Sequence, residues 1–223
     1  MPYFTQDFID FFSTLEKNNT KDWFHENKKT YEKQVKEPFK NFTQGLIDTL
    51  KDEVYPDLMM TPKESVMRIN RDIRFSKDKT PYKLHMAAFV TPYGRKNMTT
   101  PAFMLQANHN DVRVYSGCYG PDKDYLHNLR NHILYNLDEF NTLVSDKKFT
   151  SVYGEIRGEK HKRLAPDFAA IQEQQPLIAN KGFYYFFKKE PKLLLSDELI
   201  PTLVENFKIA LPLNRFITEG LER

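Results

Sequence analysis

Cysteine and long apolar stretches are scarce in this sequence of 223 residues. The single cysteine, Cys118, excludes an internal disulfide and favours a reducing compartment. No apolar run is long enough to span a bilayer. The first residues, MPYFTQDFIDFFSTLEKNN, carry acidic side chains inside an apolar stretch, which is not typical of a signal peptide. We therefore expect a cytoplasmic protein without a membrane partner.

The common motifs of metal and nucleotide sites are also missing. Neither HExxH nor CxxC occurs, which argues against a zinc site, and the phosphate-binding patterns GxxxxGK[ST] and GxGxxG are absent. His127 and His132 are five positions apart, so a helix would not align them on one face. Cys118 is a candidate nucleophile, but a lone cysteine is more often a packed residue. The sequence identifies no cofactor, and it leaves open whether the protein is an enzyme.

The composition is that of a globular protein with local basicity. Hydrophobic residues make up 40% and aromatic residues 14% of the chain, which is enough to build a sizeable core. We expect one domain over residues 1–223. The net charge is +3, but the stretch 63–83 alone carries seven cations and three acids. The positive charge is therefore concentrated in one place, which favours a site over a general nucleic-acid-coating surface.

The N-terminal part has the apolar spacing of helices. Thr5 and Thr20 are in positions to cap two successive helices, and Pro38 predicts a kink or two abutting helices in the second. We interpret its apolar stripe as core, formed by Trp23, Phe24, Tyr31, Val35, Phe39, Phe42, Leu46 and Leu50.

From Glu64 the apolar period changes to two, which indicates a strand over residues 64–76. Further strands are predicted at 82–90, 102–107 and 111–117, and NHND between the last two is a tight-hairpin signal. These strands would form an antiparallel meander over about residues 64–118.

The C-terminal half mixes helices with one more strand. Helices are predicted at 122–136 and 138–144, a strand at 182–189, and a last helix that Ser196 caps and Pro212 interrupts. The fold class is therefore α+β, with N-terminal helices packed on a central, mainly antiparallel sheet and further helices in the C-terminal half.

Four segments carry a family resemblance. They read FFSTLEKNNTKDWFHENKKTYEKQVKEPF, RINRDIRFSKDKTPYK, GCYGPDKDYLHNLR and HKRLAPDF, in this order. The sequence resembles the family of domain of unknown function 2461 over nearly its whole length. Because that family is uncharacterised, the resemblance implies one family unit and brings no catalytic assignment.

RINRDIRFSKDKTPYK is the candidate site. Arg68 and Arg74 fall on the polar face of the expected strand, where two guanidinium groups could clamp a phosphate-bearing or dicarboxylate ligand. A second basic segment, with Lys162 and Arg163, would fold back to close the site. The predicted ligand-binding residues are Arg68, Asn70, Arg71, Asp72, Arg74, Lys77, Lys79, Tyr82 and Lys83.

Two alternatives stay open for the same segment. Tyr82 and Phe75 between cations also suit a nucleic-acid strand. The other alternative is a structural network of ion pairs without a ligand. In that case Arg71, on the apolar face, needs a carboxylate from the N-terminal helices, and Arg71→Ala should lower the melting temperature sharply. The available acids are Asp7, Asp10, Glu16, Asp22 and Glu26.

Overall fold

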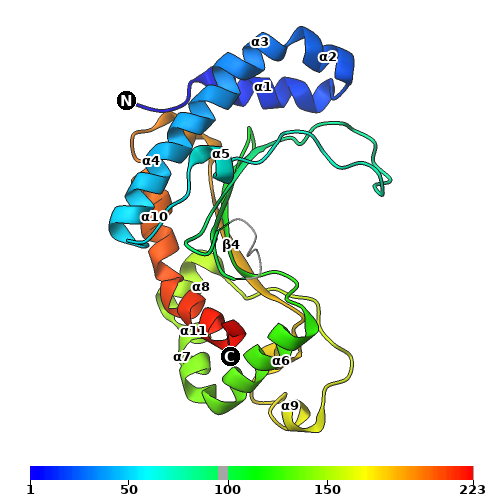
Figure 1. The fold of residues 1–223 in the computed structure, drawn as a ribbon, viewed down its shortest axis with the longest axis vertical. Coiled ribbons are helices and arrows are strands. Elements are labelled where there is room, and N and C mark those ends of the chain that lie inside the picture. The colour runs from blue at the N-terminus through cyan, green and yellow to red at the C-terminus, as the bar shows by residue number, and fades with distance from the viewer. Residues whose placement is uncertain (95–99, 223) are drawn as a thin grey trace. The chain divides into compact units, whose positions relative to one another are not determined.

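The computed structural model describes residues 1–94 and 100–222 (Figure 1). The chain divides into two compact units, each assembled from segments that are distant in sequence. Unit 1 comprises Met1–Arg95, Met104–Val114 and Lys188–Val204, and unit 2 comprises Lys96–Phe103, Tyr115–Phe187 and Glu205–Arg223. A single domain over residues 1–223 stays a prediction.

Unit 1 begins with helices, as predicted, although the last of them, α5, was not predicted. They are α1 (Gln6–Lys17), α2 (Lys21–Glu26), α3 (Lys28–Thr30), the π-helical turn η1 (Tyr31–Lys36), α4 (Glu37–Glu53) and α5 (Pro62–Ser65). Thr5 and Thr20 are the N-caps of α1 and α2, and the Thr20 hydroxyl accepts a hydrogen bond from the backbone N–H of Trp23. The aromatic stripe is core, since Phe39 and Phe42 are fully buried.

The interruption predicted at Pro38 takes the form of a wider helical turn. The Glu37 N–H donates to the carbonyl of Glu32, five residues back, at the end of η1. Proline has no N–H and its ring collides with the carbonyl four residues earlier in a regular α-helix. A π-helical turn just before Pro38 loosens that contact, so the helical path continues into α4.

The sheet contains β1 (Met86–Val90), β2 (Phe103–Ala107), β3 (Val112–Cys118) and β4 (Phe183–Lys189), in that order and antiparallel. The α+β class is thereby confirmed. Every residue of β1 is buried, as its apolar sequence predicted, and α4 contacts this strand within unit 1. The tight β2–β3 hairpin is also present, because the Asn108 N–H donates to the carbonyl of Asp111 at 3.1 Å.

The strand predicted at 64–76 is wrong. Residues 62–65 belong to α5, and the following chain is extended but pairs only at isolated bridges, Val66 with Ala88 and Asn70 with Tyr82. The predicted alternation of buried and exposed side chains is present at the start of this segment, where Ile69 is buried between exposed neighbours. Later in the segment the alternation buries no apolar face, since Phe75 is 95% exposed. A polar-apolar pattern buries a face only where another element covers it. The fourth strand is instead β4.

Unit 2 contains the helices predicted at 122–136 and 138–144, together with further helices that were not predicted. They are α6 (Lys123–Tyr135), α7 (Leu137–Ser145), α8 (Lys147–Tyr153), α9 (Pro166–Ala170), the 3-10 turn η2 (Pro176–Ala179) and α11 (Leu211–Glu222), with α11 packed on α6 and α7. The turn η3 (Pro191–Leu195) and α10 (Leu199–Ile209) precede α11. Helix α10 begins two residues later than the cap predicted at Ser196 implies, and the helices are interrupted beside Pro212 as expected.

Within the described residues, no helix combines the length and the apolar character that crossing a membrane requires.

Candidate functional site

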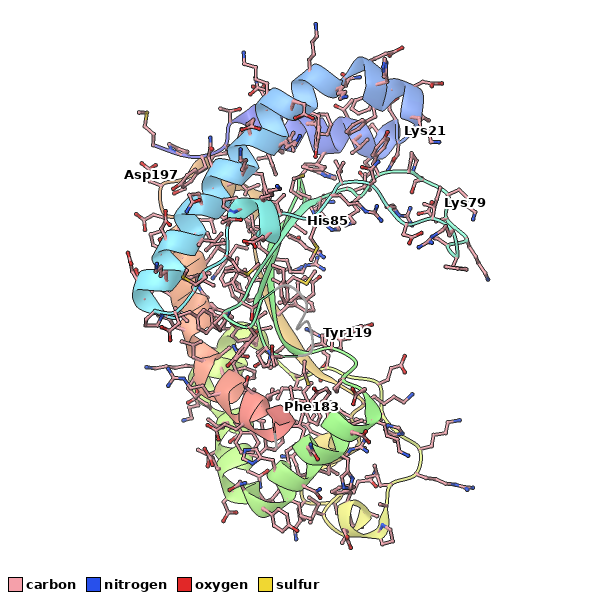
Figure 2. The ribbon with its side chains drawn as sticks, in the orientation of Figure 1. Lys21, Lys79, His85, Tyr119, Phe183 and Asp197 are labelled. Atoms are coloured by element: carbon pink, nitrogen blue, oxygen red, sulfur yellow. The ribbon has the colours of Figure 1, made fainter. Side chains whose placement is uncertain are left out.

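Residues 68–83 form a narrow extended arm of unit 1, which we call the basic arm (Figure 1). Its two sides are joined by backbone hydrogen bonds from Arg71 to the carbonyl of Pro81 (2.9 Å) and from Lys83 to the carbonyl of Ile69 (2.8 Å). Lys79 lies toward the far end and His85 just beyond the base (Figure 2). The arm therefore displays most of its cations to solvent.

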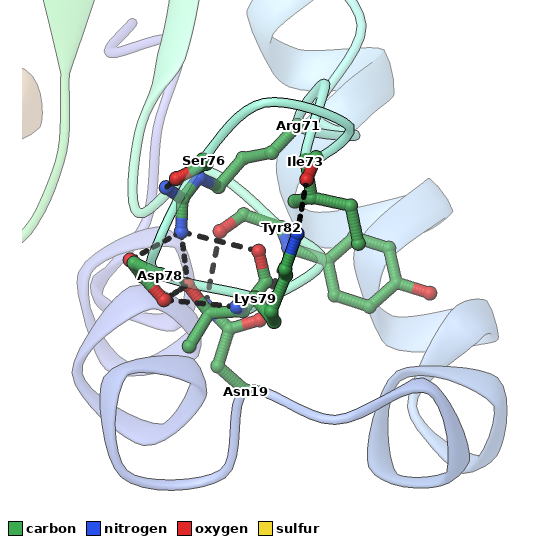
Figure 3. A network of polar contacts seen from close by, with 8 residues as sticks. Asn19, Arg71, Ile73, Ser76, Asp78, Lys79 and Tyr82 are labelled. Carbon is green, nitrogen blue, oxygen red and sulfur yellow. Dashed lines mark hydrogen bonds and ion pairs between the residues drawn. The ribbon is translucent and has the colours of Figure 1, made fainter.

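Tyr82 fixes the base of the arm to the N-terminal helices. The Asn19 side chain donates to the Tyr82 carbonyl at 2.9 Å and accepts from the Tyr82 N–H at 3.1 Å (Figure 3). The Tyr82 ring stacks on Phe24, with ring centroids 4.0 Å apart. Tyr82 is buried, so its role in this structure is to anchor the arm.

Arg71 is paired inside the arm, and not with an acid of the N-terminal helices as the alternative of a structural network required. Its Nη1 donates to Asp78 Oδ2 at 2.5 Å and to the carbonyl and hydroxyl oxygens of Thr80, and Nη2 donates to Ser76 Oγ at 3.4 Å (Figure 3). The side chain is 25% exposed, not buried in a core. A short turn brings Asp78 close at little cost in chain entropy, so this carboxylate takes the place of a distant one.

The acids of the arm are strongly held. Hydrogen bonds from the Thr80 backbone, followed by those from the Arg71 guanidinium, lower the pKa of Asp78 to about 2. Arg74 donates to Asp72 through Nε (2.9 Å) and Nη2 (2.6 Å), which lowers the pKa of Asp72 and raises that of Arg74. Two of the three predicted arginines therefore have carboxylate partners two to seven residues away.

The remaining positions of the predicted site differ in their contacts. The Lys79 ammonium donates to the carbonyl of Ile73 at 2.9 Å. Asn70 and Lys77 are exposed. Arg68 is exposed too, and no carboxylate in residues 1–94 or 100–222 forms an ion pair with it. The contribution of each to ligand binding stays a prediction.

Arg68 and Lys83 bring two positive charges together at the base of the arm. The Lys83 ammonium donates to the Arg68 carbonyl at 3.0 Å. Burial, and then the charge of Arg68, lower the pKa of Lys83. Since like charges repel, the folded chain holds this pair together at an electrostatic cost.

His85 is a neighbour of this pair that sequence reasoning missed. Burial lowers its pKa to about 4, and the charges of Lys83 and Arg113 act in the same direction, whereas Asp111 opposes them. The imidazole is therefore neutral at pH 7. Arg113 itself is paired with Asp111 at 2.5 Å. The available signal was a histidine two residues after Lys83 in an otherwise apolar strand, and its proximity to Arg113 depends on the sheet.

The other candidates of the sequence are separate from the arm. Cys118 is buried, which raises the pKa of its thiol to about 12, so it is protonated at neutral pH and inaccessible as a nucleophile. Lys162 and Arg163 are exposed residues of unit 2, and their closure over the arm stays a prediction. The described part of the chain contains no group of three or more His, Cys, Asp or Glu side chains able to hold a metal ion.

Comparison with known proteins gives the family. No curated protein matches the sequence. A family model described as a conserved hypothetical protein matches residues 7–216, which includes the whole basic arm and most of both units. The chain therefore belongs to the DUF2461 family of conserved hypothetical proteins.

Proposed function

We propose that the protein binds a small anion, phosphate- or carboxylate-bearing, at the base of the basic arm through Arg68 and Lys83. The observation that carries this proposal is that the Lys83 ammonium is bonded to the Arg68 backbone carbonyl, within reach of the Arg68 charge, and that neither side chain forms an ion pair with a carboxylate in the described residues. A bound anion would remove their repulsion. The acids of the arm form their ion pairs with Arg71 and Arg74, although the Arg68 charge also contributes to the lowered pKa of Asp72.

The side chains would have different roles. The planar guanidinium of Arg68 suits two-point binding of a carboxylate or phosphate, and Lys83 supplies a point charge. Neutral His85 can add one hydrogen bond. Arg71 and Asp78 keep the arm folded. The proposal concerns binding, and any compound that binds is the first to assay for turnover.

The test is a thermal-shift screen of phosphorylated and dicarboxylic metabolites, followed by calorimetry. A hydrogen bond to a charged group contributes about 1.5–3 kcal/mol, so Arg68→Ala should weaken binding roughly 10- to 100-fold. Lys77→Ala is the matched control, because it removes one exposed cation of the same arm. Equal effects of the two substitutions would show a diffuse charge effect and not a site. If no anion raises the melting temperature, the proposal fails.

One observation favours nucleic acid as a second candidate. Phe75 is almost fully exposed, and the Arg74 guanidinium lies 5.7 Å from the centre of its ring. An exposed aromatic ring among cations can stack on the bases of a single strand. Folding offers no reason for this exposure, since an uncovered phenylalanine forgoes its burial free energy.

Fluorescence anisotropy with a labelled single-stranded oligonucleotide tests this second function. Binding should weaken steeply as salt rises, and Phe75→Ala should reduce it while leaving small-anion binding unchanged. Tyr135→Ala, at another exposed aromatic residue, is the control. Absence of binding at low salt would exclude nucleic acid without affecting the first proposal.

A further inference from the structure

Two segments of the family resemblance lie outside the basic arm, beside β4 in unit 2. They are GCYGPDKDYLHNLR, which begins at Gly117 in β3, and HKRLAPDF, which begins at His161. Strand β3 is the neighbour of β4 in the sheet, and residues 157–161 pair with 179–184 on the other side. The chain at the start of β4 therefore has one of these segments on each side.

The part of the sheet in unit 2 has one face covered by helices and one partly exposed face. On the covered face Tyr185 packs on Phe149 of α8 and donates to Asn214 of α11 at 2.5 Å. Because side chains alternate along a strand, Tyr184 and Phe186 point to the opposite face, where they are partly exposed. We call this the open face of unit 2.

Tyr119 adds an exposed ring to the open face. It directly follows β3 (Figure 2), it is 76% exposed, and its ring centroid lies 5.2 Å from that of Tyr184 in an edge-to-face arrangement. The backbone on both sides of Tyr119 is tightly packed, since a Cβ at Gly182 would lie 3.1 Å from the Cys118 carbonyl oxygen and from the Gly120 nitrogen. A tyrosine held in this way offers a large contact surface at a low cost in side-chain entropy.

Positive charge lies on the other side of Tyr184. Arg157 and Tyr184 exchange two backbone hydrogen bonds (2.8 and 3.1 Å), and directly opposite residues of an antiparallel pair point to the same face. In agreement, the Arg157 guanidinium lies 4.2 Å from the centre of the Phe186 ring. Tyr184 thus contacts the Tyr119 ring and faces Arg157, which places an exposed ring and a basic edge next to each other.

Along this edge the cations outnumber the acids. Residues 155–163 contain four cations, Arg157, Lys160, Lys162 and Arg163, and two acids, Glu155 and Glu159. Glu159 forms its ion pair with Lys181, at 3.1 Å. In the part of the chain that the structure describes, none of the four cations forms an ion pair. The edge therefore attracts a ligand with several negative charges.

The combination of ring and charge defines the ligand. Bases of a single-stranded nucleic acid stack on exposed aromatic rings, and lysine and arginine follow its phosphates. A duplex keeps its bases stacked inside, so it would use the cations alone. An acidic protein segment would also use only the cations, and an uncharged sugar would use only the ring. A single strand is the partner that uses both features.

We propose that the open face of unit 2 binds single-stranded nucleic acid, with one base stacked on Tyr119 and the phosphates following the basic edge at residues 157–163. Tyr184 supports the Tyr119 ring from the side, and Arg157 supplies the first positive charge beyond it. The inference rests on residues of unit 2, so it is independent of the anion site and of the contact considered at Phe75, which belong to unit 1.

The experiment uses the full chain and fluorescence anisotropy at low salt, with labelled probes of about ten nucleotides. A thymidine single strand should bind roughly tenfold or more tightly than a duplex or an abasic strand of the same length, because only the single strand offers both unstacked bases and phosphates. Equal binding of the three probes would show charge attraction alone and would overturn the proposal. Failure of the thymidine strand to bind would overturn it as well.

Substitutions at Tyr119 test the stacking contact. Tyr119→Ala should weaken binding of the thymidine strand about 5- to 150-fold, the usual loss for one stacked base, and Tyr119→Phe should restore it. The melting temperature should change little, because the ring is exposed. Tyr135→Ala, at a similarly exposed ring of α6, is the control and should bind normally. An equal loss in the Tyr119 and Tyr135 variants would contradict the proposal.

Two further variants separate this face from the basic arm and the charge from the ring. Lys162→Ala should weaken binding of the thymidine and abasic strands by the same factor and reduce the salt dependence, because it removes a phosphate contact. If Phe75→Ala abolishes binding while Tyr119→Ala leaves it unchanged, the arm binds the strand and the inference about unit 2 fails.

Discussion

The two basic segments of the sequence have opposite surroundings in the structure. The basic arm is exposed, and its arginines Arg71 and Arg74 are paired with acids of the arm itself. The segment 156–163 pairs with the chain before and within β4, and it helps to bury Asn180 without a partner. Charge density is similar in both, so it does not reveal which polar groups are satisfied. That depends on which backbone each segment pairs with.

The largest expected difference in stability is between the variants Arg130→Ala and Arg71→Ala. Arg130 is 9% exposed and donates hydrogen bonds to buried carbonyl groups. Arg130→Ala leaves these carbonyl groups unpaired and should lower the free energy of unfolding by roughly 2–4 kcal/mol. Arg71→Ala removes bonds confined to the exposed arm and should change the melting temperature little. This replaces the alternative, left open by the sequence, in which a buried Arg71 supports the core.

Urea denaturation of both variants checks this contrast. A large and equal loss of stability would mean that the arm is part of the cooperative core of unit 1. The comparison between an exposed self-paired segment and a buried one would then be invalid.

A smaller effect on stability is expected when the pH is lowered and His85, beside the base of the arm, becomes protonated. The pKa of His85 is about 4 in the folded chain and near 6.5 when unfolded, so the unfolded chain binds more protons between these values. Stability should therefore fall as the pH decreases from 6.5 to 4, by roughly 1–3 kcal/mol in total. His85→Gln should remove this part of the acid sensitivity, measured by melting temperature against pH. The exposed His25 of α2 provides the control, and an identical profile for His25→Gln would contradict the assignment.

The smallest effect on overall stability concerns the anchor of the arm. Asn19→Ala removes both hydrogen bonds to the Tyr82 backbone, which should favour local opening by about 1–2 kcal/mol. Trypsin should then cleave after Lys77 and Lys79 about 5- to 30-fold faster, with little change in global unfolding. Asn18→Ala, which leaves these bonds intact, should cleave at the original rate. Unchanged cleavage of Asn19→Ala would show that stacking on Phe24 suffices to hold the arm.

The sequence by itself determined the features that depend on near neighbours. Thr20 caps α2 because its hydroxyl reaches an N–H three residues ahead, and Asn108 closes the β2–β3 hairpin within four residues. The apolar run of β1 and the helical stripe of α4 were readable for the same reason, since their periods are those of the elements themselves. The position of the basic cluster was also visible, and its role as a site stays a prediction.

Only the tertiary structure decided which groups have partners. Alternation at 64–76 predicted a strand, but the outer arm has no neighbouring element that would make it one. Arg71 pairs with Asp78, whereas the sequence offered five acids in the helices as equals. Residues 157–161 pair with residues 179–184, and Arg130 of α6 donates to the carbonyl of Asn180 in that pairing. Contacts between distant residues depend on the whole packed chain, so no local pattern of the sequence encodes them.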